Sequence, residues 1–462
     1  MNTAGFLKIK GSELVGADDQ PVVLRGTSLG GWMNMENFIT GYSANEEAQR
    51  QAIRQVLSQD KYEFFFDRFL EYFFTEDDAR FIASLGLNLL RLPINYRHFE
   101  DDMRPFEIIE SGFKHLDRVI DLCARHGIYT IIDLHAVPGY QNGDWHSDNP
   151  THVSLFWQHK HFQDRTVHLW RVFAEHFKDN PWVAGYNPIN EPDDPTDNLI
   201  APIYRQLVET IRTIDPNHLI FLEGNHYSRD FHTFGEPLPG IVYTHHDYAA
   251  PGIVAGGQYP GYTREKYYDR ETLQEDFVSL SKYMLDYHVP IWVGEFGALY
   301  TGDAETEAVR YQIVRDQLEI YKHYHASWAI WLYKDIGLQG LTYVSPDSLW
   351  LQRIQSFVNK KARLGTDSWG GRDTHIRHIL DPLEQTFASE FPNYKPAPFG
   401  NERRQIKRLV CQILMAEALL PELAELFRDM SETAIDEMMQ SFLFKNCIVR
   451  KPLAETLADY AH

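Results

Sequence analysis

Short apolar runs that end in glycine or polar residues alternate along this chain with longer segments that have helical spacing. A short apolar run bounded by such residues is typical of a buried strand, and apolar residues three and four positions apart are typical of an amphipathic helix. Counting from Val22, eight runs are predicted to contain strands: 22–32, 87–94, 128–134, 182–189, 218–223, 241–246, 290–295 and 326–333. The segments predicted as mainly helical are 44–85, 113–126, 164–179, 201–214, 271–287 and 305–323.

This alternation predicts an α/β fold with a parallel sheet. Eight units in about 330 residues, without a glycine-rich phosphate loop, predict a closed (β/α)8 barrel, the TIM barrel. Ahead of the first strand, residues 5–24 alternate weakly around Gly11 and a turn at 17–21, which predicts a β-hairpin. In a TIM barrel the reactive groups lie where the strands end, and in this chain the polar residues fall at those positions.

The pattern changes beyond about residue 365. We expect a loop at 365–373, a proline-rich connector at 391–400 and an almost wholly helical segment at 401–461, with breaks at Pro421 and near Pro452. The chain therefore divides into a barrel with its N-terminal hairpin (1–365) and a C-terminal part (366–462) made of the loop, the connector and a helical extension.

Leucine-rich stripes at helical spacing, including Leu409, Ile413 and Leu414, leave two interpretations of this extension open. In the first, which we prefer, it is a cap that packs on the side of the barrel. In the second, it is a separate binding or oligomerisation module, and the chain forms a homo-oligomer through its C-terminal helices.

Two of the predicted strands end in a glutamate. The fourth runs into Asn190, Glu191 and Pro192, and the seventh ends in Gly294 and Glu295. A carboxyl group at the end of a buried strand is held in one direction and partly shielded from water, which suits it to proton transfer near neutral pH. Two such residues indicate the two-carboxylate chemistry of glycoside hydrolysis. The alternative is that one of them forms a salt bridge at the mouth of the barrel.

The charge and composition of the chain indicate which kinds of binding partner to exclude and where in the cell to expect the protein. A formal net charge of −21 argues against nucleic acid or an anionic membrane, because phosphate binding needs clustered cations. The first residues lack the pattern of a secretory signal, and no apolar run is long enough for a spanning helix. Cys123, Cys411 and Cys447 are far apart, which favours a reduced, cytoplasmic protein.

Several ordered motifs, spread over about residues 5–350, resemble glycoside hydrolase family five, a large family of retaining β-glycosidases built on (β/α)8 barrels. Residues 190–192 (NEP) are similar to its acid/base motif, and residues 294–297 (GEFG) are similar to its nucleophile motif. Residues 25–36 (RGTSLGGWMNME) and 132–143 (IDLHAVPGYQNG) resemble the exo-acting β-glucanases of the family. The resemblance implies that Glu191 is the acid/base and Glu295 the nucleophile.

The resemblance also implies roles for residues around this pair. Arg91 matches the arginine that keeps the nucleophile ionised, so that Glu191, with less compensation, stays protonated. The alternative is a structural ion pair between Arg91 and Asp133. His135 and Asn190 match contacts to sugar hydroxyls, with Asn190 on the 2-hydroxyl. His135 could instead be a buried core histidine.

Two more strand ends carry aromatic residues. His246 and Tyr248 match a His-x-Tyr pattern in which the tyrosine touches the nucleophile, whereas His245 lacks this spacing. Trp331 matches the aromatic floor under the reacting sugar. The alternatives are that Trp331 only packs in the barrel or that Tyr333 takes its place.

We expect no metal and no cofactor. His146 and Asp148, next to Trp145, suggest a metal site at first sight, but they lack a complete set of ligands. A metal-dependent barrel hydrolase is the weaker rival hypothesis, and sensitivity to a chelator would distinguish it.

The substrate is inferred from Glu36, which matches an acidic residue that holds hydroxyls of a terminal sugar. An anion at the closed end of a site favours removal of single sugars from the non-reducing end of short β-linked oligosaccharides. The segment 33–37, the motif after the eighth strand and the helical tail depart from the glucanases and resemble intracellular bacterial members that include β-mannosidases. We therefore expect a β-mannosidase, with a β-glucosidase or exo-β-glucanase as the alternative. A catalytically inactive carbohydrate-binding barrel is the alternative from a different class.

Overall fold

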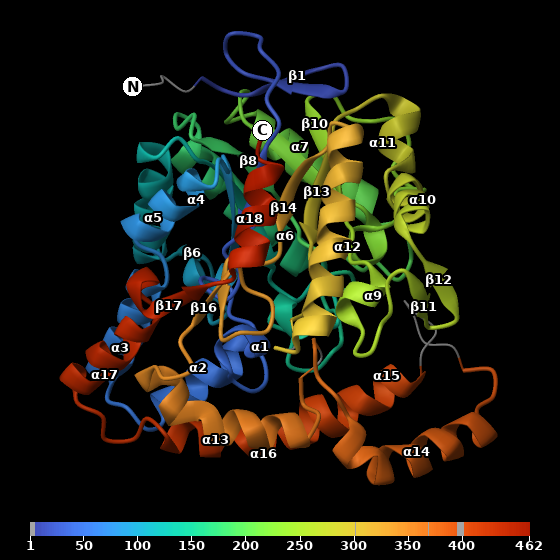
Figure 1. Ribbon diagram of the computed structural model, residues 1–462. Helices are drawn as coiled ribbons and strands as arrows, with labels where there is room; N and C mark the ends of the chain where they lie inside the picture. The colour runs from blue at the N-terminus through green and yellow to red at the C-terminus, as the bar shows by residue number, and fades with distance from the viewer. Residues whose placement is uncertain (1–4, 301, 368, 395–401) are drawn as a thin grey trace.

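The structure, a computed structural model, describes residues 5–300, 302–367, 369–394 and 402–462. Its centre is a closed barrel of parallel strands that neighbour one another in the order of the chain (Figure 1). The strands are β3 (Arg25–Ser28), β4 (Leu89–Asn95), β7 (Tyr129–Ala136), β8 (Val183–Asn187), β9 (Leu219–Glu223), β10 (Ile241–His246), β13 (Ile291–Phe296) and β14 (Ser327–Ile330). Each overlaps one predicted run, so the predicted (β/α)8 barrel is confirmed.

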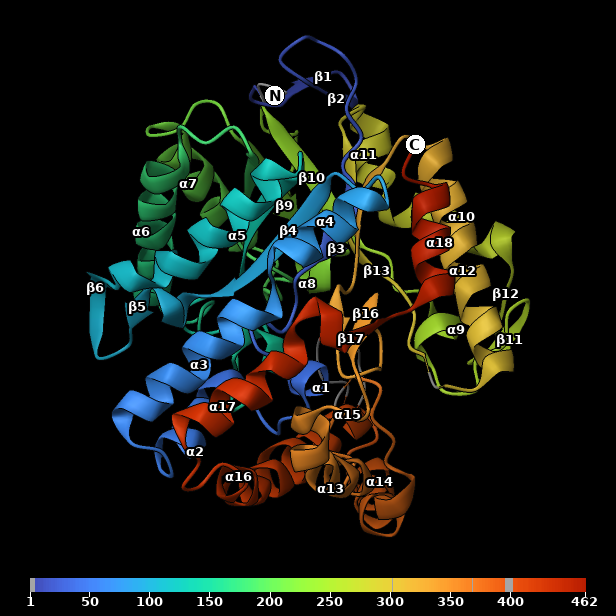
Figure 2. The same ribbon diagram turned by 60° about the vertical axis from the view of Figure 1, so that its left-hand side comes forward.

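Helices cover the outside of the barrel and, in both views, the region at its lower end (Figures 1 and 2). They are α1 (Asn37–Thr40), α2 (Glu46–Arg54), α3 (Gln59–Phe73), α4 (Glu76–Ser84), α5 (Phe113–Arg125), α6 (Lys160–Phe177), α7 (Ile200–Arg212), α8 (Asn225–Ser228), α9 (Ala250–Ile253), α10 (Arg270–Leu280), α11 (Lys282–Tyr287), α12 (Ala304–His323) and α13 (Leu349–Arg363). Two small hairpins lie in the loops, β5 (Glu100–Asp101) with β6 (Arg104–Ile108) and β11 (Gly261–Thr263) with β12 (Lys266–Tyr268). Within the described part of the chain, none of these helices has both the length and the hydropathy to span a bilayer.

The amino-terminal end of the barrel is closed by apolar side chains. The predicted hairpin is present as β1 (Lys8–Lys10) and β2 (Glu13–Val15), which pair in antiparallel register around Gly11. Its residues Leu7 and Leu14 pack on a buried cluster inside the barrel that includes Phe221 and Trp292. The strands are parallel, so their polar carboxyl ends all lie at the opposite end of the barrel.

The C-terminal part lies across that opposite end of the barrel, and its last helix then returns beside α12 (Figure 1). Its elements are α14 (Arg377–Glu390), α15 (Glu402–Lys407), a π-helical segment (Arg408–Met415), α16 (Ala416–Glu425), α17 (Glu432–Met439), β17 (Cys447–Val449) and α18 (Lys451–Asp459). Two short strands precede it in the loop after the eighth barrel strand, β15 (Lys334–Asp335) and β16 (Thr342–Val344). The short strands form one sheet, in which β17 pairs antiparallel with β16. A strand this late in the chain is absent from the helical prediction.

The core of the extension is continuous with the core around the barrel. Phe427 stacks on Trp350 of α13 at a ring distance of 5.8 Å and meets Phe65 of α3 edge to face. Phe442 packs against Phe69 and is completely buried. At the far end, the Tyr460 hydroxyl donates to Glu319 of α12, and Arg25 of β3 donates to the Ala461 carbonyl. These contacts agree with a cap on the barrel, although most of it covers the end of the barrel and only α18 lies on the predicted side (Figure 1). A homo-oligomer through these helices stays a prediction.

Two details of the extension differ from the prediction. Pro421 lies inside α16 instead of ending it, and the break falls at 426–431, between α16 and α17. Pro421 and Glu417 are both exposed, so water can satisfy the carbonyl that loses its helical donor. Leu409 and Leu414 are 62% and 67% exposed, five residues apart in the π-helical segment, so this stripe does not pack on the barrel. Pro452 lies in the first turn of α18, near the predicted break, and the predicted connector lies mostly outside the described residues.

Candidate active site

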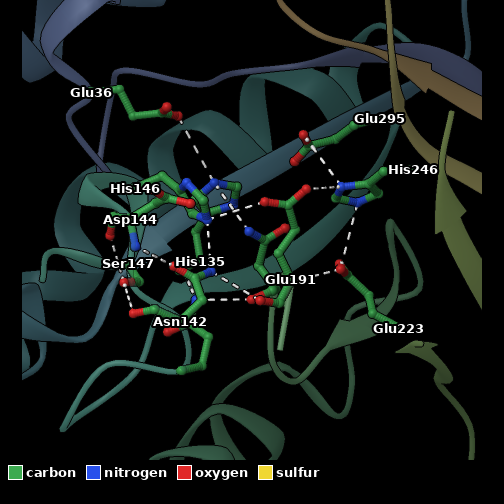
Figure 3. Close-up of polar contacts among 12 residues, drawn as sticks. Glu36, His135, Asn142, Asp144, His146, Ser147, Glu191, Glu223, His246 and Glu295 are labelled. Atoms are coloured by element: carbon green, nitrogen blue, oxygen red, sulfur yellow. Dashed lines mark hydrogen bonds and ion pairs between the residues drawn. The ribbon is translucent and has the colours of Figure 1, made fainter. Parts of the chain in front are cut away.

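The two glutamates predicted to be catalytic face each other at the carboxyl ends of the barrel strands (Figure 3). Glu295 belongs to β13, and Glu191 follows the end of β8. A carboxyl oxygen of each and a ring nitrogen of His246 all lie within 4.8 Å of one another. The fold therefore brings together two residues that are about a hundred positions apart in the sequence.

The backbone at Glu191 has an unusual conformation. Its φ of 43° is in the left-handed region, which a residue with a side chain adopts only when its surroundings hold it there. The amide of Glu191 donates to Oε2 of the buried Glu223 at 2.7 Å, and Asn142 donates to its carbonyl at 2.9 Å. These bonds fix the direction of the side chain.

Both carboxyl oxygens of Glu295 accept hydrogen bonds, one from β4 across the barrel and one from the segment that follows β10. Arg91 donates to Oε1 at 2.5 Å, and the Tyr248 hydroxyl donates to Oε2 at 2.8 Å. Arg91 is completely buried and also lies 3.0 Å from Asp133, so the two interpretations of Arg91 describe one network. Burial would lower the pKa of Arg91, but its carboxylate neighbours raise that pKa, so the guanidinium stays charged.

Glu191 lies between two histidines (Figure 3). Its Oε1 is 2.7 Å from Nδ1 of His246, and its Oε2 is 3.1 Å from Nε2 of His146. Burial alone would raise the pKa of Glu191, but hydrogen bonds from the two histidines outweigh it and hold that pKa well below its usual range. The expectation that Glu191 stays protonated in the resting site is not met by these contacts.

The histidines carry the complementary shift. Burial lowers the pKa of His146, but the hydrogen bond and charge of Glu191 raise it to about 9. The pKa of His246 is also raised well above its ordinary value, because the charges of Glu295 and Glu223 outweigh its burial. The raised pKa values place a proton on the histidines beside Glu191 rather than on Glu191 itself. This proton lies within hydrogen-bond distance of the Glu191 carboxyl group.

Glu36, which precedes α1, faces this group from the other side, with Oε1 3.9 Å from Nε2 of His135. Its side chain is only 12% exposed, and Oε1 has no protein hydrogen-bond partner. Burial raises the pKa of Glu36 to about 8. The residue is consequently a neutral carboxyl near pH 7, able to donate and to accept, and the expected anion is corrected.

His135 and Asn190 lie beside Trp331. His135 is held by Asp133 at Nδ1, at 2.7 Å, and its Nε2 is 3.3 Å from Nδ2 of Asn190. Asn190 in turn accepts from Arg91 at 2.6 Å. The rings of His135 and Trp331 are stacked, 5.4 Å apart and inclined by 8°. His135 is thus held by Asp133 at Nδ1, and its Nε2 lies near Asn190 and Glu36 in the candidate site.

The two aromatic candidates after the eighth strand lie in different surroundings. The Trp331 indole lies against Gly30, where even a Cβ atom would come within 2.6 Å of the ring. Tyr333 points away, since its hydroxyl donates to the buried Asp78 of α4. His245 likewise bonds Ser281 outside this group.

Three residues that the sequence did not single out as functional border the site. His146 was considered only as a metal ligand, Glu223 only as the end of a strand, and Trp369 only as part of a loop. The Trp369 ring meets Tyr248 edge to face at 5.0 Å. Asp148, which was considered together with His146 as a metal ligand, accepts hydrogen bonds from Arg97 and from the backbone amide of Glu47.

One group in the described part of the chain has the spacing of a cation site, namely Glu191, His246 and Glu295. Their carboxyl oxygens already contact His146, His246, Arg91 and Tyr248. A cation would therefore have to displace these hydrogen bonds.

Two facing carboxyl groups at the strand ends of a TIM barrel, with an arginine on one and histidines on the other, define the class of the glycoside hydrolases. Residues 17–337 match the family described as cellulase (glycosyl hydrolase family 5). The chain belongs to this family and is a glycoside hydrolase.

Relatives are found over both the whole chain and the barrel. A Phanerodontia chrysosporium protein named beta-xylosidase is 46% identical and covers 99% of this chain and 98% of its own length. An Aspergillus clavatus protein named probable glucan 1,3-beta-glucosidase A is 28% identical over 49% of this chain and 56% of its own. A solved structure of an endogalactoceramidase shares the fold, with a TM-score of 0.53 and 16% identity over 77% of this chain and 78% of that one. The first of these alignments includes the helical extension.

Proposed function

We propose that the protein is a retaining, exo-acting β-glycosidase that removes single sugars from the non-reducing end of short β-linked oligosaccharides. In this proposal Glu295 is the nucleophile and Glu191 is the acid/base. The observation that carries it is the short separation of the two carboxyl groups, with one oxygen of each within 4.8 Å.

This separation supports retention of configuration. Retaining glycosidases have carboxyl groups about 5–5.5 Å apart, whereas inverting enzymes need about 6.5–9.5 Å to admit a water molecule. Glu295 attacks the anomeric carbon as Glu191 protonates the leaving oxygen, which gives a glycosyl-enzyme intermediate. Water then attacks that intermediate and gives its proton to Glu191, so both residues return to their starting state.

The surroundings of Glu36 support action at a chain end. Behind Glu36, the backbone of Asn37 accepts from the buried Lys361 at 3.1 Å, and Asn37 bonds Asp367. On the flank, Asn34 donates to the His146 carbonyl at 3.0 Å. These bonds join three segments of the chain next to Glu36, which supports a site that is closed on this side.

The sugar is proposed from the relatives and from the sequence. The relative named beta-xylosidase aligns with almost the whole chain, extension included, which makes a β-xyloside the first substrate to test. The sequence hypothesis of a β-mannosidase, and its alternative of a β-glucosidase or exo-β-glucanase, belong in the same panel. A cytoplasmic location stays a prediction, which cell fractionation can check.

The test is a panel of aryl β-xylosides, β-mannosides, β-glucosides, β-galactosides and cellobiosides, followed by oligosaccharides. Proton NMR of the first-formed sugar should show the β-anomer, and an initial α-anomer would show inversion. Glu295→Ala and Glu191→Ala should each abolish most turnover. Azide should give a β-glycosyl azide with Glu191→Ala and an α-glycosyl azide with Glu295→Ala, because the anion attacks the intermediate in the first and the free face of the substrate in the second. Full activity of either variant would refute the pairing.

The same panel addresses the alternatives from other classes. A carbohydrate-binding barrel without catalysis would bind sugars and release none from any substrate. A metal-dependent hydrolase would lose activity after treatment with EDTA and regain it with added cation. We expect turnover that is insensitive to EDTA.

A further inference from the structure

The C-terminal extension reaches the loop that carries His146. Arg408, in the π-helical segment, donates to Oδ1 of Asp144 at 2.7 Å, and Arg404 donates to Oδ2. The side chains of Asp144 and Arg408 are only 13% and 6% exposed. Burial would raise the pKa of Asp144, but the two arginines outweigh it and hold that pKa well below its usual range. This is a buried ion pair between residues that are 264 positions apart.

Asp144 is tied in turn to the turn around His146 (Figure 3). Its amide donates to Asn142 Oδ1 at 2.9 Å, and its carbonyl accepts from the Ser147 hydroxyl at 2.7 Å. Asn142 also donates to the backbone carbonyl of Glu191 at 2.9 Å. The position of Asp144 therefore sets the position of the His146 ring relative to Glu191.

The groups that face His146 come from several elements. Nδ2 of Asn142 lies 2.8 Å from Nε2 of His146, and Oε2 of Glu191 lies 3.1 Å from the same nitrogen. The His135 ring lies 5.5 Å away and the Tyr227 ring 6.4 Å away, both edge to face. The charge of Asp144 also favours the protonated form of the imidazole, and Glu36 does so once its carboxyl ionises, above about pH 8.

We infer that His146 is a positioning residue that shares a proton with Glu191, and that the C-terminal extension holds His146 in place through the Arg404–Asp144–Arg408 ion pairs. The inference rests on the proposed function, in which Glu191 is the acid/base. It gives the extension a part in the first chemical step, although the extension contributes neither glutamate.

Each proton that is used in the first step is returned in the second step. In the resting site one proton is shared between Nε2 of His146 and Oε2 of Glu191, 3.1 Å apart, while Nδ2 of Asn142 lies 2.8 Å from the same Nε2. Transfer of that proton leaves a neutral imidazole and a Glu191 carboxylic acid, which gives the proton to the leaving oxygen as the glycosidic bond breaks. In the second step the attacking water returns a proton to Glu191 and from there to His146.

Dependence on the leaving group tests this inference. A 2,4-dinitrophenyl leaving group departs without a proton, whereas an alkyl or sugar leaving group needs one. Because positioned acid catalysis contributes about 10²–10⁴-fold, His146→Gln should lower kcat/KM for a sugar leaving group by about 10- to 100-fold. It should lower kcat/KM for the dinitrophenyl glycoside by less than about 3-fold. An equal fall on both substrates would mean a merely structural role and would overturn the inference.

The role of the extension is tested by Asp144→Asn, which keeps the size of the side chain, and by Arg408→Gln with Arg404→Gln. We expect the same selective loss, about 3- to 30-fold for the sugar leaving group, with an unchanged far-UV circular dichroism spectrum. Arg403→Gln is the matched control, since Arg403 lies in the same helix but pairs with Asp373 and Glu384. If the double variant does not fold, Asp144→Asn alone decides.

The failures of the two proposals differ. If the wild type turns over no substrate of the panel, the proposed function fails. If the wild type is active but Asp144→Asn shows the substrate pattern of Arg403→Gln, the proposed function stands and the inference about the extension falls.

Discussion

The Tyr248 hydroxyl lies 2.8 Å from Oε2 of Glu295, on the side of the carboxylate opposite the Arg91 contact. The Glu295 residue is only 5% exposed, so these two donors replace water as its partners. They leave the carboxylate a single orientation, toward Glu191. Orientation of this kind contributes to catalysis by holding the attacking oxygen in line with its target.

Loss of the Tyr248 hydroxyl should impair the chemistry more than the fold. A hydrogen bond to a charged group is worth about 1.5–3 kcal/mol, so Tyr248→Phe should lower kcat/KM about 10- to 100-fold. Tyr333→Phe is the matched control, because its hydroxyl bonds the buried Asp78 away from the site. That variant should lose about 1–3 kcal/mol of unfolding free energy in urea and keep its kcat. A fully active Tyr248→Phe would contradict the role of this contact.

Glu36→Gln should change the pH dependence of activity rather than activity itself. Burial raises the pKa of Glu36 to about 8, so its neutral form, which glutamine imitates, prevails near pH 6. We expect kcat/KM of the variant to stay within about 3-fold of the wild type at pH 6. The decline of the wild type through pH 8 should be absent from the variant. Glu36→Ala should be weaker at every pH, and an unchanged decline in Glu36→Gln would refute this interpretation.

The stability of the protein should depend on pH through His146. Its pKa is raised in the folded state to about 9 from an ordinary 6.5, so its contribution is complete below pH 6.5 and is lost as pH rises through 9. Glu191 acts in the opposite sense, since its pKa is lowered, and its contribution is lost as pH falls below about 4.5. His146→Gln should therefore show a smaller fall in Tm between pH 7 and pH 10 than the wild type. His232→Gln, at an exposed position, should follow the wild type.

Removal of residues 400–462 should make the barrel insoluble. The buried Lys334 donates to the Phe442 carbonyl at 2.7 Å, and Phe427 fills a space beside Trp350. Truncation leaves this ammonium short of a partner and exposes apolar surface, which promotes association. Static light scattering and the soluble fraction on expression measure this. Leu409→Ser with Leu414→Ser, at positions already exposed, should change neither, and a soluble, fully active truncation would show an independent module.

The barrel could be predicted because each strand is a short apolar run that stops at a polar residue. Glu191 and Glu295 were found by the same rule, since a carboxylate at the end of a buried strand stands out from its surroundings. The sequence also carried the resemblance that assigned Arg91 and Tyr248. In these places local pattern and global fold agree.

His146 could not be identified in this way. Its contact with Glu191 depends on the path of an irregular loop, and that path depends on Arg408, far away in the sequence. The ionisation of Glu36 and Glu191 was also beyond the sequence, because burial and the two histidines determine it. In the extension, the stripe through Leu409 assumed ordinary helical spacing, whereas the segment is π-helical and leaves this side chain in solvent.

The extension touches both rims of the barrel, with Arg408 at the candidate site and Ala461 beside the first strand of the barrel. A segment attached at both ends of a barrel cannot detach without breaking contacts at each. In many enzymes a terminal segment unfolds locally before the rest of the protein does. We expect no such local unfolding in this extension. Amide exchange in α15 to α18 should therefore require the same opening free energy as exchange in the barrel strands. Heating should consequently take the enzyme from fully active to unfolded in one step, without a half-active state in between.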